Sequence, residues 1–390
     1  MKKNAHEHGS WPPAVGLALI GLAVLLLAGA GIAIWQLRCA PRVVPGEEWA
    51  SKSPLAAGFS SEKLAAFSER VGGAGCILHR GEMIHSWGDI SARQDMGGAA
   101  DPLYAFWAMR AIQDGLAGSL DDRILVWAPA LRDLNPDLDF KDRQITLRHL
   151  LNQTSGYGLQ EKPGEAFATT GDSRMLLAHV LNRGVYRARP GRENQLFSRC
   201  EPHLTLGFED DPILKSETQP LGRIFISVRD LARFGLLTLY KGRWGDATVL
   251  RQDLFQEMLE DRLSPKRVQP ASGKSAERLP DFPEVASDEC ETNHLGCRGL
   301  AWWFNRRVAG GDGWLLPELP RNILLAEGWG GRTALILIPR HRLVVVWALE
   351  PQDAPAWRPF SESGRLKVAD MLHDVLDARA EPNLHLAYEE

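Results

Sequence analysis

The chain has 390 residues, of which 44% are hydrophobic and 24% charged, a composition typical of a globular protein with a substantial core. Its formal net charge of -4 argues against a nucleic-acid partner, because phosphate binding requires a concentrated positive field. We therefore expect one large domain or two closely packed ones.

A charge-free stretch near the N-terminus predicts a membrane span. No charged residue occurs from Gly9 to Leu37, and the run "AVGLALIGLAVLLLAGAGIAIW" can cross a hydrocarbon core of about 30 Å as a helix. A cleaved signal peptide is the alternative, but the run exceeds the roughly 7 to 15 apolar residues of such a peptide. We expect an N-terminal tail at 1–13 and one uncleaved transmembrane anchor at 14–37.

The segment after the anchor is rich in Pro, Gly and small residues, which predicts a linker over 38–57. The folded domain is expected to follow it directly. An amphipathic pattern predicts a helix over 59–71, and two short apolar runs predict a hairpin over 73–89 that turns at Arg80 and Gly81.

The middle of the chain, about residues 95–300, is predicted to be a mainly helical insertion. Apolar side chains recur at helical spacing in four stretches, at 103–115, 144–156, 175–184 and 227–244. The polar, Pro-containing stretch from about Ser264 to Cys297 predicts a long surface loop. Cys290 and Cys297 are close in sequence, so that either a disulfide or two thiols fits this loop.

The C-terminal part mirrors the beginning of the domain. Two β-branched runs predict a hairpin over 333–350, and helical spacing predicts a helix over 363–380 ahead of a short tail at 381–390. A helix and hairpin at the start, with a hairpin and helix at the end, favour an α+β fold. In this fold one antiparallel sheet is assembled from both termini of a domain at 58–380, and its terminal helices cover the sheet.

Four blocks then resemble the β-lactamase-related serine hydrolases, a family that includes class C β-lactamases, DD-peptidases and esterases. They occur in the family order and read "AIQDGLAGSLDDRI", "KDRQITLRHLLNQTSGYG", "SVRDLARFGLLTLYKGRWGD" and "EGWGGRTALILIPRHRLVVVW". The resemblance covers about residues 58–378 and implies the penicillin-binding-protein-like fold. It also implies a bacterial protein at the inner membrane, with its domain facing outward into the periplasm.

The resemblance further implies three catalytic boxes. The first is Ser-x-x-Lys, in which the Ser is the acyl-forming nucleophile and the Lys its base. The second is Tyr-x-Asn or a variant of it, and the third is a Gly-rich box with a Lys or His at the sheet edge. Two backbone N–H groups form the oxyanion hole.

The first box falls on positions that cannot perform this chemistry. Counting back from "SLDD" places the Ser on Gly98, which has no side chain, and the Lys on Asp101, which has the opposite charge. Pro102 suits the first position of a helix and Asp101 suits its N-cap, so a helix start is still expected here.

The other two boxes also lack their titratable groups. In "FATTGDSRM" the Tyr position falls on Thr169, and the next position of interest is Thr170, Gly171 or Asp172. In "EGWGG" the His position falls on Trp329, or on Ala326 in an alternative register, and neither residue is a cation. The flanking glycines would still let backbone approach a ligand.

Several other residues are weighed against ordinary structural roles. Ser60 and Lys63 form the only Ser-x-x-Lys of the chain but stand at a predicted helix start, where capping is the expected role. Ser155 and Tyr157 could form a relocated pair, although a turn is favoured. For three further groups a packed or solvated role is favoured over a ligand site: His149, the arginines at 183, 187, 189, 192 and 199, and the tryptophans at 302, 303 and 314.

Two functional hypotheses follow. The first is a membrane-tethered pseudoenzyme that binds a cell-wall fragment, a small molecule or a protein partner in a cleft between the sheet and the helical part. The second is an active serine hydrolase of β-lactam, peptide or ester bonds with an unrecognised nucleophile. The sequence indicates no cofactor and no metal site, since it has no phosphate-binding Gly loop and no zinc spacing.

Overall fold

A computed structural model describes residues 43–189, 191–194, 200–214, 222–260, 263, 268–280, 297–308, 313–349 and 362–379. The chain from Val43 onward forms one compact unit. The predicted anchor at 14–37, the tails at 1–13 and 381–390, and Cys290 lie outside the described residues. Within the described ranges, no helix is both long and apolar enough to cross a membrane.

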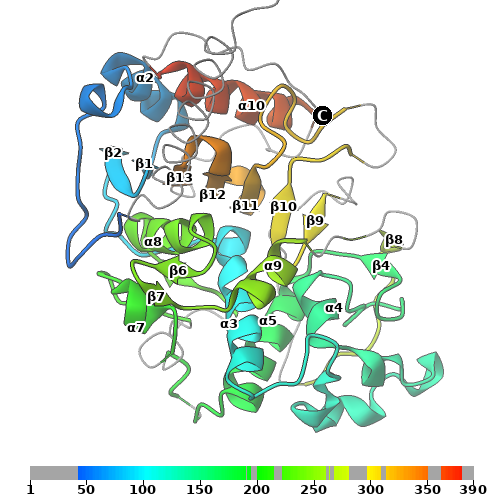
Figure 1. Cartoon of the computed structure of the whole chain (residues 1–390). Coiled ribbons are helices and arrows are strands. Elements are labelled where there is room, and N and C mark those ends of the chain that lie inside the picture. The colour runs from blue at the N-terminus through cyan, green and yellow to red at the C-terminus, as the bar shows by residue number, and fades with distance from the viewer. Residues whose placement is uncertain are drawn as a thin grey trace, which may run out of the picture. The chain divides into compact units, whose positions relative to one another are not determined.

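A seven-stranded antiparallel sheet organises the domain, in the order β2-β1-β13-β12-β11-β10-β9 (Figure 1). The strands are β1 (Ala74–His79), β2 (Glu82–Trp87), β9 (Arg298–Gly299), β10 (Trp302–Phe304), β11 (Leu324–Gly328), β12 (Thr333–Ile338) and β13 (Leu343–Ala348). Strands β1 and β13 pair from Ala74 opposite Ala348 to His79 opposite Leu343. The expectation of one sheet built from both ends of the domain is confirmed.

Both faces of the sheet are covered, which explains why its central strands are apolar throughout rather than alternating. Helices α2 (Ser61–Val71) and α10 (Glu362–Asp377) cover one face, where Val345 and Trp347 join their apolar core. Helices α3 (Pro102–Gln113) and α8 (Val228–Leu239) lie on the other, where Val344 and Val346 point (Figure 1). Successive residues of β13 therefore serve two separate cores.

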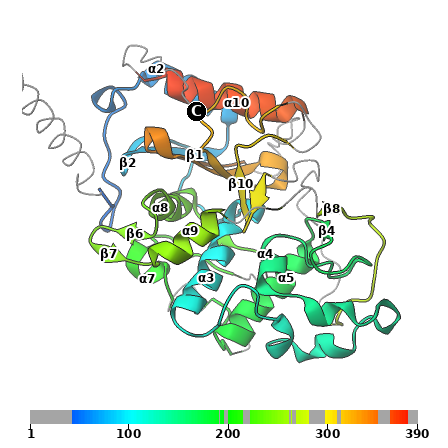
Figure 2. The same cartoon turned by 45° about the vertical axis from the view of Figure 1, so that its right-hand side comes forward.

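The insertion is mainly helical, as expected, and is built around α3 (Figure 2). Its other helices are α4 (Leu147–Leu151), α5 (Gly171–His179), α7 (His203–Leu206), α9 (Gln252–Glu260) and a π-helix at Val180–Val185. Short 3-10 helices occupy Leu55–Ala57, Gly97–Ala100 (η2), Ile124–Val126, Pro129–Asp133, Pro136–Leu138, Lys141–Gln144, Trp329–Gly331 and Pro339–His341 (η10). Two-residue strands are β3 (Gln94–Asp95), β4 (Ala166–Phe167), β5 (Phe225–Ile226), β6 (Arg243–Trp244), β7 (Ala247–Thr248) and β8 (Gln269–Pro270).

The expected linker at 38–57 differs from the structure, because the chain is in contact with the domain from Val43 onward. The hydroxyl of Tyr240 donates a hydrogen bond to the Val43 carbonyl at 3.0 Å, and the Arg233 guanidinium donates to the carbonyls of Gly46 and Glu47. These contacts are between residues almost two hundred positions apart, which composition alone does not reveal.

Helix α8 lies close to the sheet because it carries a glycine at the contact. A Cβ atom on Gly235 would be 2.7 Å from the Leu335 Cδ1 atom and 2.8 Å from the Val344 Cγ1 atom. Separations under 3.0 Å would force the helix or its neighbours to move.

We predict that Gly235→Val lowers the free energy of unfolding by about 1–3 kcal/mol, because it overpacks this contact. Urea unfolding measures the change. The matched control is Gly46→Val, since no heavy atom lies within 4 Å of a Cβ there, and we expect it to stay within about 0.5 kcal/mol of the parent. Equal effects of the two variants would contradict the packing argument.

Strand β1 ends in a buried histidine. His79 is 7% exposed, and its Nε2 atom has no hydrogen-bond partner among the residues that the structure describes. Burial, together with the positive charges of Arg80, Arg379, Lys52 and Arg342, lowers its pKa to about 4. The folded protein therefore holds this imidazole neutral at pH values where an unfolded chain would protonate it.

We predict that acid weakens the domain partly through His79. Because the folded pKa is depressed, the contribution of His79 to stability is complete above its unfolded pKa of about 6.5 and is lost as the pH falls toward 4. In urea unfolding near neutral pH and at about pH 5, His79→Gln should lose less stability on acidification than the parent. Parallel losses in both proteins would contradict this assignment.

Candidate functional site

The first predicted box lies where the chain enters the buried helix of the insertion. Gly98 is inside η2, and Asp101 occupies the position before α3, which begins with Pro102 as expected. Asp101 is the N-cap residue of α3, as expected, but its side chain makes no cap hydrogen bond to the helix. That carboxylate is instead 5% exposed and turned toward another element.

Asp101 forms a buried ion pair with Arg174 on α5. The Arg174 Nε atom donates to Asp101 Oδ1 at 2.7 Å, and its NH2 atom donates to Oδ2 at 3.1 Å, so that both carboxylate oxygens are engaged. The two side chains are 7% and 3% exposed, respectively. Arg298 on β9 approaches the same carboxylate at 4.0 Å. Bidentate contact of this kind is the strongest geometry for an Arg–carboxylate pair.

The end of β11 brings the third box against the first. A Cβ on Gly328 would be 2.5 Å from the Met96 carbonyl oxygen and 2.6 Å from the Gly98 nitrogen, so only glycine permits this approach. The Thr333 hydroxyl donates to the same Met96 carbonyl at 2.7 Å. The backbone at the end of β11 therefore lies directly against the backbone of η2, which leads into α3.

Trp329, at the predicted His position, has a packing role in the structure. Its indole nitrogen donates to the Asp95 carbonyl at 3.0 Å, and the guanidinium of Arg223 lies 4.4 Å from its ring centroid. Arg332 lies 5.5 Å from the same ring. Ala326, the alternative register, is buried within β11.

The second box leads into α5. The Thr169 hydroxyl is buried and has no hydrogen-bond partner among the described residues. Thr170 is the N-cap of α5, and its hydroxyl accepts from the Ser173 nitrogen at 3.2 Å. Asp172 is buried and accepts from Arg278 Nε at 2.6 Å. Since Arg174 follows on the same helix, α5 connects this segment to Asp101.

Sequence reasoning missed the cations of this region. Arg174, Arg223 and Arg298 are each no more than 5% exposed, and none of them stands at a position that the three boxes assign, although Arg174 lies in the segment that carries the second box. No spacing links them in the sequence, so only the folded chain brings them beside Asp101 and Trp329. One signal was available in the sequence. Asp101 directly precedes a strongly apolar helix, and a carboxylate buried there would need a cationic partner.

Tyr104, one turn after Asp101 on α3, is 1% exposed, and its hydroxyl has no hydrogen-bond partner within the described part of the chain. Burial raises its pKa well above the ordinary value, and the Asp101 charge raises it further. A phenol held neutral in this way cannot act as a general base.

The residues that the sequence offered as alternative site residues have structural roles. Ser60 caps α2 by accepting from the Lys63 nitrogen, which confirms the expected capping role. His149 caps α4 together with Thr146, and burial lowers its pKa.

The hydroxyls of Ser155 and Ser173 are buried and lie 2.7 Å apart. Tyr157 accepts a hydrogen bond from the Leu279 nitrogen, and burial raises its pKa to about 12, so it supplies no base to Ser155. Trp302 and Trp303 are buried, in line with a packing role.

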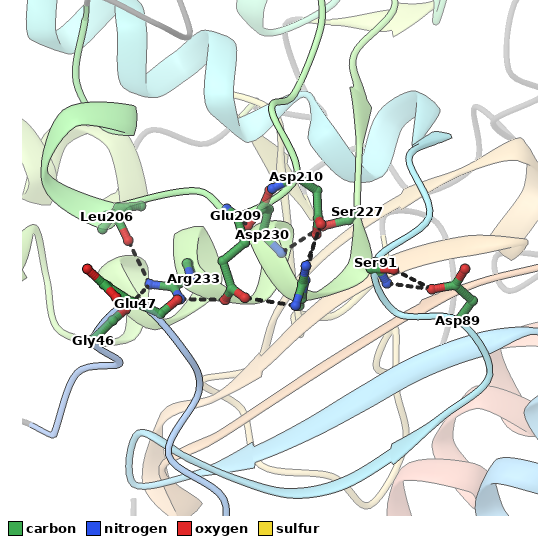
Figure 3. Close-up of polar contacts among 11 residues, drawn as sticks. Gly46, Glu47, Asp89, Ser91, Leu206, Glu209, Asp210, Ser227, Asp230 and Arg233 are labelled. Carbon is green, nitrogen blue, oxygen red and sulfur yellow. Dashed lines mark hydrogen bonds and ion pairs between the residues drawn. The ribbon is translucent and has the colours of Figure 1, made fainter.

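The "SVRDLARFG" block is a structural network (Figure 3). Arg233, fully buried, pairs with Glu209 at 2.5 Å and also binds the Leu206 carbonyl. Arg229 pairs with Asp210, and Asp230 accepts from the backbone nitrogens of Glu209 and Asp210. The block therefore fixes a loop to α8. Its retention does not require a catalytic role.

No protein family model matches the sequence, and no curated protein matches it. Solved structures do. A putative 6-aminohexanoate-dimer hydrolase from Bacillus anthracis has a TM-score of 0.57 at 14% identity, covering 86% of this chain and 88% of its own. A putative β-lactamase from Bacteroides dorei has a TM-score of 0.54 at 17% identity, covering 81% of this chain and 97% of its own. The chain has a β-lactamase-like fold.

A class C β-lactamase agrees, with a TM-score of 0.51 at 12% identity over 83% of this chain and 95% of its own. The β-lactamase-like fold that the sequence resemblance implies is thus confirmed, and at these identities the likeness concerns the fold alone. Among the residues placed by the structure, no group of three or more His, Cys, Asp or Glu side chains could hold a metal ion.

We predict strong coupling between Asp101 and Arg174. Arg174→Met should lower the free energy of unfolding by about 3–5 kcal/mol, because it leaves a buried carboxylate uncompensated. Asp101→Leu/Arg174→Met should be markedly more stable than the sum of the single losses implies. A double-mutant cycle in urea measures this coupling, and additive single effects would contradict the pairing.

Proposed function

We propose that the chain is a membrane-tethered, outward-facing member of the β-lactamase-like fold that acts by binding rather than by acyl transfer. The proposed ligand is a cell-wall fragment or a protein partner. The observation that carries the proposal is Asp101, which stands where the resemblance implies a catalytic lysine and whose two oxygens are both engaged by Arg174.

Acyl-enzyme chemistry needs a nucleophile and a group that takes its proton. Gly98 supplies no side-chain atom, and the segment 96–115 contains no Ser, Thr, Cys, Lys or His. A carboxylate held in a buried bidentate ion pair is not available as a base without breaking that pair. Thr169 and Trp329 supply neither a phenol nor a cation. These substitutions together support a non-hydrolytic role.

An active hydrolase with an unrecognised nucleophile is the second candidate. The buried hydroxyl pair of Ser155 and Ser173 is the observation that favours it, because Ser173 directly precedes Arg174 on α5. Each of these hydroxyls hydrogen-bonds to the other, so activation would require a base to displace one of them.

Covalent labelling separates the two functions. Purified full-length protein is incubated with a fluorescent penicillin and with a fluorophosphonate, and intact mass is measured. We predict no label, together with retained binding of muropeptides or of a protein partner. Stoichiometric labelling of any serine would overturn the proposal, and peptide mapping of the adduct to Ser155 or Ser173 would establish the hydrolase.

Restoring the box tests the assignment of Gly98 and Asp101. In Gly98→Ser/Asp101→Lys/Arg174→Met the last change removes the guanidinium that would repel the new lysine, and we predict measurable labelling by the fluorophosphonate. Gly98, unlike Gly97, is not in the left-handed region, so a serine there meets no backbone strain. The matched control Asp101→Lys/Arg174→Met should stay unlabelled, and Ser60→Ala should change nothing. A folded but inert triple variant would contradict the register.

A further inference from the structure

The described chain begins at one end of the sheet. The Val43 carbonyl accepts from Tyr240 at the end of α8, and a Cβ on Gly81 would be 2.0 Å from the same oxygen. Val43 therefore lies against the turn between β1 and β2. In Figure 2 this start of the chain is dark blue and lies beside β6 and β7.

Little chain separates this point from the predicted span. Residues 38–42 are five in number, so that even fully extended they reach about 20 Å from Leu37 to Val43. Lipid headgroups occupy about 6 Å of that distance on each side of the hydrocarbon core. Since Val43 is bonded to the domain, a span at 14–37, as in the proposed function, would keep this end of the sheet within that reach of the bilayer.

The same end carries unpaired positive charge. Arg80, in the β1–β2 turn, donates its backbone N–H to the carbonyl of Arg342, in the β12–β13 turn, at 2.9 Å. Arg80, Arg340 and Arg342 are exposed, and none of them forms an ion pair within the described part of the chain. We call these three residues the exit arginines. Lys241, next to Tyr240, is exposed as well.

Among the acidic groups near this end, Glu82 pairs with Lys52 at 3.3 Å, and Glu47, Glu48 and Asp246 are exposed. Within the described residues, none of these carboxylates forms an ion pair with an exit arginine. Two histidines lie at this end, His79 at the end of β1 and His341 in the β12–β13 turn. Burial lowers the pKa of both imidazoles, and the positive charge of nearby arginines contributes to the lowering.

We propose that the exit arginines dock this end of the domain on the headgroups of an anionic lipid surface. The short tether holds the cluster within reach, and the charges complement the lipid. The domain thus presents a fixed face to the bilayer and directs its opposite end away from it. This inference rests on the membrane tether of the proposed function and is independent of whether the protein hydrolyses anything.

The test uses the full chain in nanodiscs of phosphatidylcholine, alone or mixed with phosphatidylglycerol. Amide hydrogen exchange of residues 80–82 and 340–342 should slow in the anionic discs, and high salt should reverse the effect. Since each basic residue near an anionic surface changes a binding constant about five-fold, Arg80→Gln/Arg340→Gln/Arg342→Gln should weaken docking about 100-fold. The matched control changes Arg187, Arg189 and Arg192, which are exposed on the helical part, to Gln and should dock normally.

Three results would overturn docking: equal exchange in both kinds of disc, an unchanged triple variant, or loss of docking in the control. Carbonate extraction distinguishes failure of the tether from failure of the docking face. If carbonate releases the chain, the chain has no anchor, and both the tether and the docking face are overturned. If the chain is retained but its amide exchange does not slow in anionic discs, only the docking face is overturned. The labelling experiment addresses the non-hydrolytic function separately.

Discussion

The pairing of β1 with β13 is the constraint on which the rest of the structure depends. These strands come from opposite ends of the domain and run side by side over six residue pairs, from Ala74–Ala348 to His79–Leu343. Once they pair, α2 and α10 share one face of the sheet, while α8 of the helical insertion packs on the other and β9, β10 and β11 extend the sheet itself. The same pairing places β12 and β11 so that Gly328 meets Gly98.

At the start of α3, the chain carries the negative charge of Asp101, whereas the resemblance implies the positive charge of a lysine there. A carboxylate at position 101 cannot remain buried without a cation, and Arg174 supplies it through two hydrogen bonds. Arg298 and Arg223 add further cations around Asp101 and Trp329. The ion pair joins the start of α3 to α5, so that Asp101, where the resemblance implies a lysine, connects two elements of the insertion.

The α8 network gives the "SVRDLARFG" block a structural role. Arg229, Asp230 and Arg233 bind a loop and the entering chain, and each of these contacts would be lost with the side chain. Arg233 also binds the segment at Gly46 and Glu47, which a Pro- and Gly-rich composition suggested was a free linker.

The sequence by itself determined the α+β fold, because two apolar hairpins and two amphipathic helices at the ends of the domain can bury their faces in only one economical sheet. It also predicted that the three boxes fall on Gly98, Asp101, Thr169 and Trp329, since motif order follows the chain. The partner of Asp101, the packing of Trp329 and the attachment of Val43 depended on tertiary structure, because Arg174, Arg223 and Tyr240 lie far away in sequence. A side chain's charge can be read locally, but the neighbour that compensates it is chosen only when the chain is folded.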